Sequence, residues 1–154
     1  HGAISDPAAL DALAEAGAEP GDPFDRAIGG FTPSGGTPER IVGTLAFLGS
    51  WQGYDRVAVV SFDEGSAVII VPAYTHIADP GAFRFGPVAP EDLDVFVVKS
   101  RLHFRRGFDE TGFAPTIVVV EAPGPFVGTT YLDALPYENV DLSRLYPYGT
   151  PPGR

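Results

Sequence analysis

A group of side chains that could do chemistry follows directly after a short apolar run. The run is Val95 to Val98, and the group is Lys99, Ser100, His103 and Arg105. A continuous apolar run is typical of a strand covered on both faces, and ligands in open α/β sheets bind outside the carboxyl ends of such strands. If Ser100 caps a helix, His103 lies in its first turn, where the helix dipole attracts anions and favours a neutral imidazole.

These residue types suit the polarisation of a carbonyl and the binding of a carboxylate. We therefore expect His103 and Lys99 to be catalytic, and Arg105 and Ser100 to bind substrate. Ser100 is not expected to be a nucleophile, because the sequence shows no orienting carboxylate and no GxSxG elbow. The alternative is a solvated helix face, with its arginines paired to Asp109 and Glu110.

The elements that must position these residues form a mixed α/β pattern. A helix is expected after Asp6 as N-cap and Pro7, and it ends at Gly17. Its apolar face holds Leu10, Leu13 and Ala14. Three β-rich segments with turns between them predict an antiparallel middle: Ile41 to Leu48, Val57 to Phe62 and Ala67 to Ala73.

A βα unit is predicted over residues 94–120. Its covered strands are Val95 to Val98 and Ile117 to Val120, joined through a helix around Arg101 to Phe108 in a right-handed crossover. The tail from Gly124 is rich in Pro, Gly and Tyr and is expected to be an irregular aromatic wrap. The predicted fold class is therefore α/β.

Several short motifs, in this order and spacing, resemble one family. They are Ile4-Ser5-Asp6-Pro7, Ile28-Gly29-Gly30, Phe85-Gly86, Lys99-Ser100-x-x-His103-Phe104-Arg105, the strand Ile117 to Val120, Ala122-Pro123-Gly124, Leu135-Pro136-Tyr137 and Leu145-Tyr146-Pro147. Together they resemble the C-terminal domain of the MlrC (microcystinase C) family of metallopeptidases, the M81 type. The resemblance covers nearly the whole chain, and the KSxxHFR segment is its most specific part.

The resemblance implies a zinc-dependent peptidase or amidohydrolase that cleaves amide bonds in small peptides. In that family an N-terminal domain binds the catalytic zinc through aspartate and histidine. The implied partners are that N-terminal metal-binding domain and a small peptide substrate, with residues 99–105 facing the cleft. His1 to Ile4 looks like the end of a strand, so residues 1–154 are expected to be a single domain and a fragment, inactive on its own.

We predict no metal ligands within this chain. It contains neither HExxH nor HxH, and the nearest approximation, His76 with Asp79, is more typical of a loop histidine. One alternative is a secreted copper redox protein in which His1 forms a histidine brace with His76 or His103. Another is a non-catalytic module that binds an anion or a partner through a basic patch formed by Lys99, Arg101, Arg105 and Arg106.

Composition excludes some classes of partner. The net charge of −10 disfavours nucleic acid and anionic membranes, whose recognition depends on many basic residues. No apolar run is long enough to span a bilayer and no signal segment is recognisable, so we expect a cytoplasmic protein. The absence of cysteine excludes disulfides and thiolate chemistry.

Overall fold

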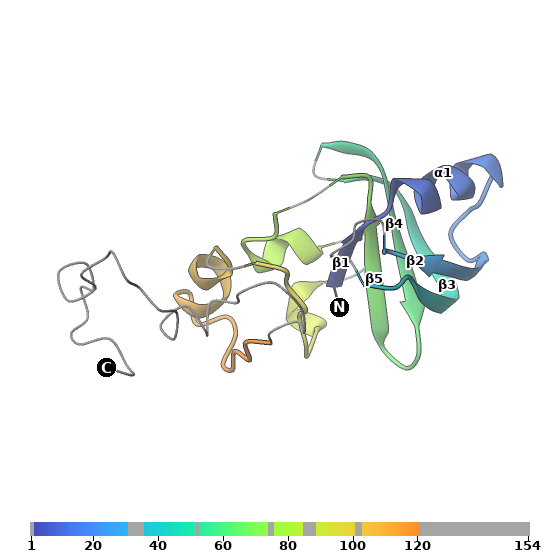
Figure 1. Cartoon of the computed structure of the whole chain (residues 1–154). Helices are drawn as coiled ribbons and strands as arrows, with labels where there is room; N and C mark the ends of the chain where they lie inside the picture. The colour runs from blue at the N-terminus through green and yellow to red at the C-terminus, as the bar shows by residue number, and fades with distance from the viewer. Residues whose placement is uncertain are drawn as a thin grey trace, which may run out of the picture. The chain divides into compact units, whose positions relative to one another are not determined.

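The computed structural model describes residues 2–30, 36–51, 53–73, 76–84, 89–100 and 103–120 (Figure 1). The chain divides into two compact units, His1–Pro115 and Thr116–Arg154. The helices and strands described below all lie in the first unit. Within the described residues, no helix is long and apolar enough to cross a membrane.

The first unit is built on a curled, mixed sheet of five strands in the order β1-β5-β4-β3-β2 (Figure 1). The strands are β1 (Gly2–Ser5), β2 (Pro23–Ile28), β3 (Glu39–Trp51), β4 (Tyr54–Phe62) and β5 (Ser66–Val71). β1 pairs with β5 in parallel, and the other pairs are antiparallel. The predicted antiparallel middle is therefore confirmed. The described residues hold a single α-helix, however, so the fold is mostly β and fits the α/β class only loosely.

Helix α1 (Pro7–Glu15) forms where its end signals place it. Asp6 is the N-cap, with Pro7 at the first helical position. After the helix, Gly17 adopts a positive φ of 62°, which suits glycine at a C-terminal cap. The face toward the sheet carries Ala9, Leu10 and Leu13, whereas Ala14, predicted on that face, is exposed.

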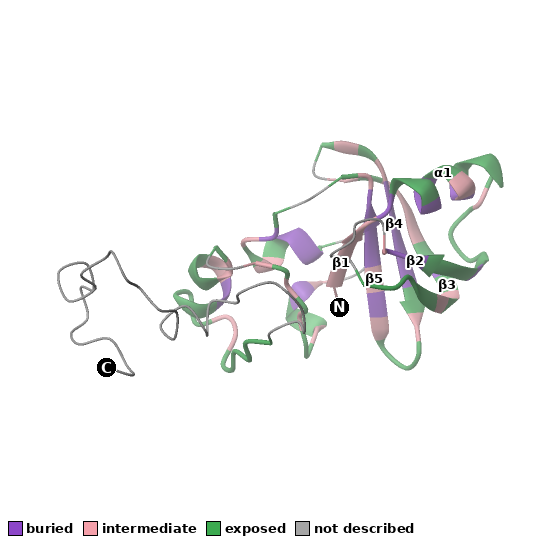
Figure 2. Ribbon diagram, in the orientation of Figure 1, coloured by how far each residue is buried: buried purple, intermediate pink, exposed green. Residues whose placement is uncertain are grey.

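Both faces of the central strands are covered. Alternate residues of β4 and β5 belong to two separate apolar clusters, as the two-residue period of a strand requires. One cluster joins Ala58, Val60 and Ile70 to α1. The other joins Val57, Val59 and Ile69 to residues after β5, including the 3₁₀ turn η1 (Pro80–Phe83). Figure 2 shows these central strands as the most buried part of the sheet.

A bulge in β3 assigns its large side chains to different faces. Leu45 pairs with Val60, but Phe47 pairs with Val59, so the register shifts between Leu45 and Phe47. Ala46 is the extra residue of this bulge. In a regular strand Leu45 and Phe47, two positions apart, would point to the same face of the sheet. Leu45 instead contributes to the cluster with α1, and Phe47 packs against the opposite cluster.

The predicted βα unit over 94–120 is wrong. Residues 95–98 form no strand and make only one isolated parallel bridge, between Val97 and Gly2. Val95 and Val97 are 64% and 66% exposed, while Phe96 and Val98 pack against the core. Residues 117–120 likewise form no strand, and Val120 is 83% exposed. The side chains of residues 95–98 thus alternate between core and solvent. An apolar run of this composition could equally be a strand buried on both faces, so composition alone does not separate the two cases.

The rest of the predicted pattern has mixed outcomes. Of the helix expected around residues 101–108, the described residues 103–108 show only the start of one π-helical turn, η3 (Arg105–Asp109), preceded by Phe104 in helical conformation. A further 3₁₀ turn, η2 (Pro90–Asp92), precedes the apolar run. The aromatic tail from Gly124 lies outside the described residues.

Asp6 links β5, α1 and the chain after β2 through its backbone N–H and its buried carboxylate. Its backbone N–H donates to the carbonyl of Val71, and its side-chain oxygens accept from the N–H groups of Ala9 at 2.8 Å and Gly29 at 3.1 Å. The residue is only 1% exposed. The carboxylate thus ties the start of α1 to the chain after β2.

Asp6→Ala is expected to lower the free energy of unfolding by about 1 to 3 kcal/mol, because it leaves buried N–H groups unpaired. Urea denaturation measures this change. Asp11→Ala is the matched control, because Asp11 lies on α1 but pairs with Arg56 at the exposed surface. Asp11→Ala should lower the free energy of unfolding by less than about 1 kcal/mol. Equal losses for the two variants would contradict a structural role for the Asp6 carboxylate.

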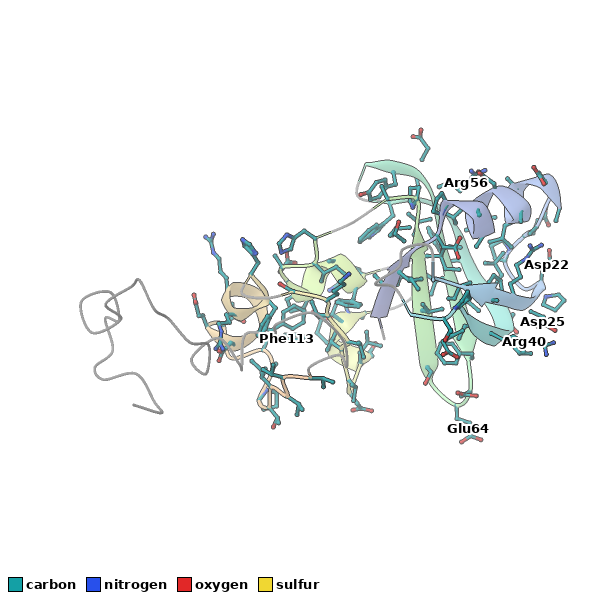
Figure 3. All side chains as sticks on the ribbon, in the orientation of Figure 1. Asp22, Asp25, Arg40, Arg56, Glu64 and Phe113 are labelled. Atoms are coloured by element: carbon teal, nitrogen blue, oxygen red, sulfur yellow. The ribbon has the colours of Figure 1, made fainter. Side chains whose placement is uncertain are left out.

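An exposed ion pair between β2 and β3 lowers the pKa of one acidic residue, Asp25. Asp25 on β2 accepts hydrogen bonds from Arg40 Nε at 2.7 Å and Nη2 at 2.6 Å (Figure 3). These bonds, more than the positive charge itself, lower the pKa of Asp25. The contribution of this pair to stability is therefore present above the ordinary Asp pKa and is lost as the pH falls through the lowered value.

Arg40→Gln is expected to raise the pKa of Asp25 toward its ordinary value, as measured by NMR titration of the side-chain carboxyl. Arg26→Gln is the control, because Arg26 is an exposed arginine next to Asp25 on β2. It should leave the pKa of Asp25 nearly unchanged. High salt should reduce the difference between wild type and Arg40→Gln, because the pair is exposed. An unchanged titration in Arg40→Gln would contradict the assignment.

Candidate functional site

The predicted site segment is anchored to the core by four phenylalanines. Phe83, Phe96, Phe108 and Phe113 make edge-to-face contacts, with ring centroids 5.0 to 6.5 Å apart. Phe83 and Phe108 are buried in the cluster that covers β4 and β5. Figure 3 labels Phe113, which lies at the end of the first unit away from the Asp25–Arg40 pair. Because edge-to-face packing fixes ring positions, this cluster holds η3 and the chain around it in place.

Ser100 holds the start of the helical turn. Its Oγ accepts a hydrogen bond from the backbone N–H of Phe104 at 3.3 Å. A usual N-cap bonds to the second or third helical residue, so this contact reaches one residue further than expected. The turn then closes through a 2.8 Å bond from the N–H of Glu110 to the carbonyl of Arg105. The predicted N-cap role of Ser100 is therefore wrong, because the N-cap of η3 is Phe104, and the Ser100 hydroxyl bonds to the N–H of that residue instead.

Gly107 brings η3 against the loop after β5. A Cβ at this position would lie 2.3 Å from the carbonyl oxygen of Ala78 and 2.5 Å from the Cα of Asp79. Real Cβ atoms do not approach backbone this closely, so only glycine permits this packing. The approach carries His103, just before the turn, close to His76, just before Ala78.

The two imidazoles are in direct contact. Their ring centroids lie 4.3 Å apart and their planes meet at 87°, an edge-to-face arrangement. Both residues are exposed. Two histidines far apart in sequence therefore share one place on the surface of the first unit.

The basic residues of the segment are only partly available to a ligand. Arg105 Nη1 lies 3.1 Å from Asp109 Oδ2, and its guanidinium lies 5.5 Å from the ring centroid of Phe104. The predicted pairing of a segment arginine with Asp109 is therefore confirmed. Lys99 is exposed. An anion that binds Arg105 must compete with the Asp109 carboxylate.

The structure thus brings His103 to His76, Ser100 to Phe104 and Arg105 to Asp109. No group of three or more potential ligands (His, Asp, Glu) that could hold a metal occurs in the described ranges. His1, on which the copper-brace alternative depends, lies outside them. The expectation that residues 99–105 line a substrate cleft stays a prediction.

Comparison with known protein families gives a match that covers most of the chain. The family described as "MlrC C-terminus" matches residues 1–139. This chain belongs to the MlrC C-terminus family. The resemblance in its motifs is therefore confirmed at the level of the family. A search of curated proteins found no match to this MlrC C-terminal domain.

Two residues of this MlrC C-terminal domain acquire importance only from the structure. In the sequence His76 is a loop histidine beside Asp79 and a ligand in the copper-brace alternative, and nothing there marks it as the neighbour of His103. Gly107 is one glycine within the predicted helix. An isolated glycine inside a helical pattern lowers helix propensity and can mark a packing constraint, which is the signal that the sequence offers at this position. It does not reveal which loop approaches.

Proposed function

We propose that this domain is the C-terminal part of a zinc-dependent MlrC-like peptidase or amidohydrolase that hydrolyses amide bonds in small peptides. The observation that carries the proposal is the family match over residues 1–139. The described residues of this chain offer no complete zinc site. The zinc ligands are therefore assigned to the N-terminal metal-binding domain of the same polypeptide. Bound zinc would supply Lewis-acid chemistry there.

In this proposal the domain contributes one wall of the substrate cleft. His103 and Lys99 donate hydrogen bonds or positive charge to the reacting carbonyl, and Arg105 binds a substrate carboxylate in exchange for Asp109. Ser100 fixes the turn that carries these groups, and its hydroxyl takes part in substrate binding. The exposure of His103 and Lys99 supports these roles, and Arg105 is also exposed although it is paired with Asp109.

The 154-residue chain alone is expected to fold but not to hydrolyse peptides. Its first unit has a core on both sides of the sheet, whereas its described residues lack a metal constellation. The test compares this chain with the full-length polypeptide on short peptides, with and without a chelator. Hydrolysis by the full-length protein alone, abolished by the chelator and restored by zinc, is the expected result.

Two outcomes would contradict the proposal. Chelator-sensitive hydrolysis by the 154-residue chain would show that the proposed N-terminal domain is not needed. Absence of any zinc-dependent amide hydrolysis by the full-length polypeptide, tested over peptides of varied sequence, would remove the peptidase assignment. Circular dichroism and thermal melting of the same preparations establish that each protein is folded.

A further inference from the structure

We propose that four residues, Asp94, Val95, Val97 and Lys99, form a strip that binds a short, extended peptide with apolar side chains and a free amino group. In this arrangement the amino group of the peptide lies at Asp94, its apolar side chains contact the two valines, and the carbonyl to be cleaved lies at Lys99. The inference rests on the proposed function and deepens it, because it names the class of peptide that the cleft accepts. The four residues are called the peptide strip below.

The valines of the peptide strip present apolar surface to solvent. Val95 and Val97 are 64% and 66% exposed, whereas Phe96 and Val98 pack against the core. Single exposed apolar residues are common on protein surfaces, but two that point to solvent from one anchored segment form a continuous apolar surface. Contact with apolar side chains of a ligand removes that surface from water, which favours binding.

Packing beneath the peptide strip holds its backbone in place. Phe96 contacts three other phenylalanines edge to face, with ring centroids 5.0 to 5.5 Å apart. Val97 forms a parallel bridge with Gly2, where a Cβ at position 2 would lie 3.3 Å from Val97 Cβ and from its carbonyl oxygen. A tight turn then ends the segment, closed by a 3.1 Å bond from the N–H of Ser100 to the carbonyl of Val98. A peptide therefore meets a surface whose backbone is already ordered, which lowers the entropic cost of binding.

Opposite charges lie at the two ends of the peptide strip. Asp94 and Lys99 are both exposed, and neither forms an ion pair with any residue that the structure describes. Their Cα atoms are five residues apart and so lie within about 18 Å of each other, the length of about five residues of extended peptide. The order of the charges suits a peptide whose amino group lies at Asp94 and whose carbonyl groups approach Lys99.

Two observations favour a peptide substrate over a second copy of this chain as the occupant. The peptide strip ends at Lys99, which the proposed function places at the reacting carbonyl, so a ligand on the strip is continuous with the candidate site. The net charge of −10 on every copy opposes the approach of two copies.

The test is an NMR titration of the isotope-labelled 154-residue chain with a tetrapeptide of two valines followed by two alanines, with a free amino group. The backbone N–H signals of residues 94–99 should shift. Replacing both valines of the peptide by serine should weaken binding about three-fold or more, because apolar contact is lost. Acetylating the amino group should weaken binding about two-fold or more, because the charge that Asp94 attracts is removed.

Three variants assign these preferences to individual side chains. Val97→Thr keeps the shape of the side chain but replaces a methyl group by a hydroxyl, so it should remove most of the preference for the valine peptide. Asp94→Asn should remove the preference for the free amino group. Val42→Thr is the matched control, because Val42 is 61% exposed on β3, outside the peptide strip. It should bind like the wild type, and thermal melts check that every variant is folded.

The same peptides are then given to the full-length polypeptide. Its kcat/KM should be about three-fold or more higher for the valine peptide than for the serine peptide, and Val97→Thr should reduce that ratio toward one.

The proposal is overturned if the valine and serine peptides bind equally, if Val97→Thr binds like the wild type, or if Val42→Thr loses as much affinity. It is also overturned if the full-length enzyme hydrolyses both peptides equally well, or if dilution of the chain alone shifts the same signals, because a second copy then occupies the peptide strip. Failure of the proposed function is a different result. A full-length protein that hydrolyses no peptide, while the binding preferences hold, removes the peptidase assignment and leaves the peptide strip as a binding site.

Discussion

Gly43→Ala is expected to cost the domain about 3 kcal/mol or more in free energy of unfolding, enough to threaten folding of a marginally stable protein. Gly43 lies on β3 beside Ser61 of β4. A Cβ there would come within 2.1 Å of the Ser61 carbonyl oxygen, a backbone atom inside the sheet. Relief requires the two strands to separate, which breaks their hydrogen-bond ladder. Urea denaturation of the purified variant measures the loss.

Gly49→Ala on the same strand is the matched control. Its new Cβ would meet the tip of the Phe47 ring at 3.0 Å, and a side chain can yield where backbone cannot. The control should therefore lose markedly less stability than Gly43→Ala. If the two substitutions cost the same, close contact between β3 and β4 is not the reason that position 43 is glycine.

His103→Ala in the full-length enzyme is expected to lower turnover about 10²- to 10³-fold, about 3 to 4 kcal/mol in the transition state, if His103 acts at the reacting group. This expectation rests on the proposed function. Tightly bound zinc and the melting temperature should change little, because the His103 side chain is exposed. Turnover, zinc stoichiometry and melting temperature are measured on one preparation.

Arg106→Ala supplies the comparison, because Arg106 is an exposed basic residue on the same turn with no assigned role. It should retain near-normal turnover. A His103→Ala enzyme with normal turnover per folded molecule and a lowered melting temperature would refute the functional assignment and make this histidine structural. An equal loss of turnover in His103→Ala and Arg106→Ala would indicate a general effect of positive charge on this segment.

Local signals were sufficient to predict α1 and the antiparallel strands. The Asp6-Pro7 start and the Gly17 end act within a few residues, and the turn at residues 63–66 joins β4 to β5 as expected. At this turn Asp63 and Gly65 adopt positive φ, at 49° and 84°. Such features depend on neighbours in sequence, so the sequence alone contains what is needed to find them.

The strand wrongly predicted at residues 95–98 and the contact that the sequence did not predict at His103 both depend on contacts between distant residues. Whether Val95 to Val98 is covered on both faces depends on what packs there, and the structure covers β4 and β5 instead. The contact of His76 with His103 depends on Gly107 and the aromatic cluster, which bring together two loops on either side of η1 and η2. The motifs located the segment around His103, but not its partner.

The position of β1 determines the order in which the sheet can be completed. β1 is the first strand of the chain, yet it pairs in parallel with β5, matching Gly2 to Val68 and Ser5 to Val71. The hairpins β3–β4 and β4–β5 can form from nearby residues, but β1 has no complete partner until β5 exists. Closing so long a loop is slow. During synthesis β1 therefore remains unpaired until β5 has formed, and the β1-facing edge of β5 is the last edge to be protected from pairing with another chain.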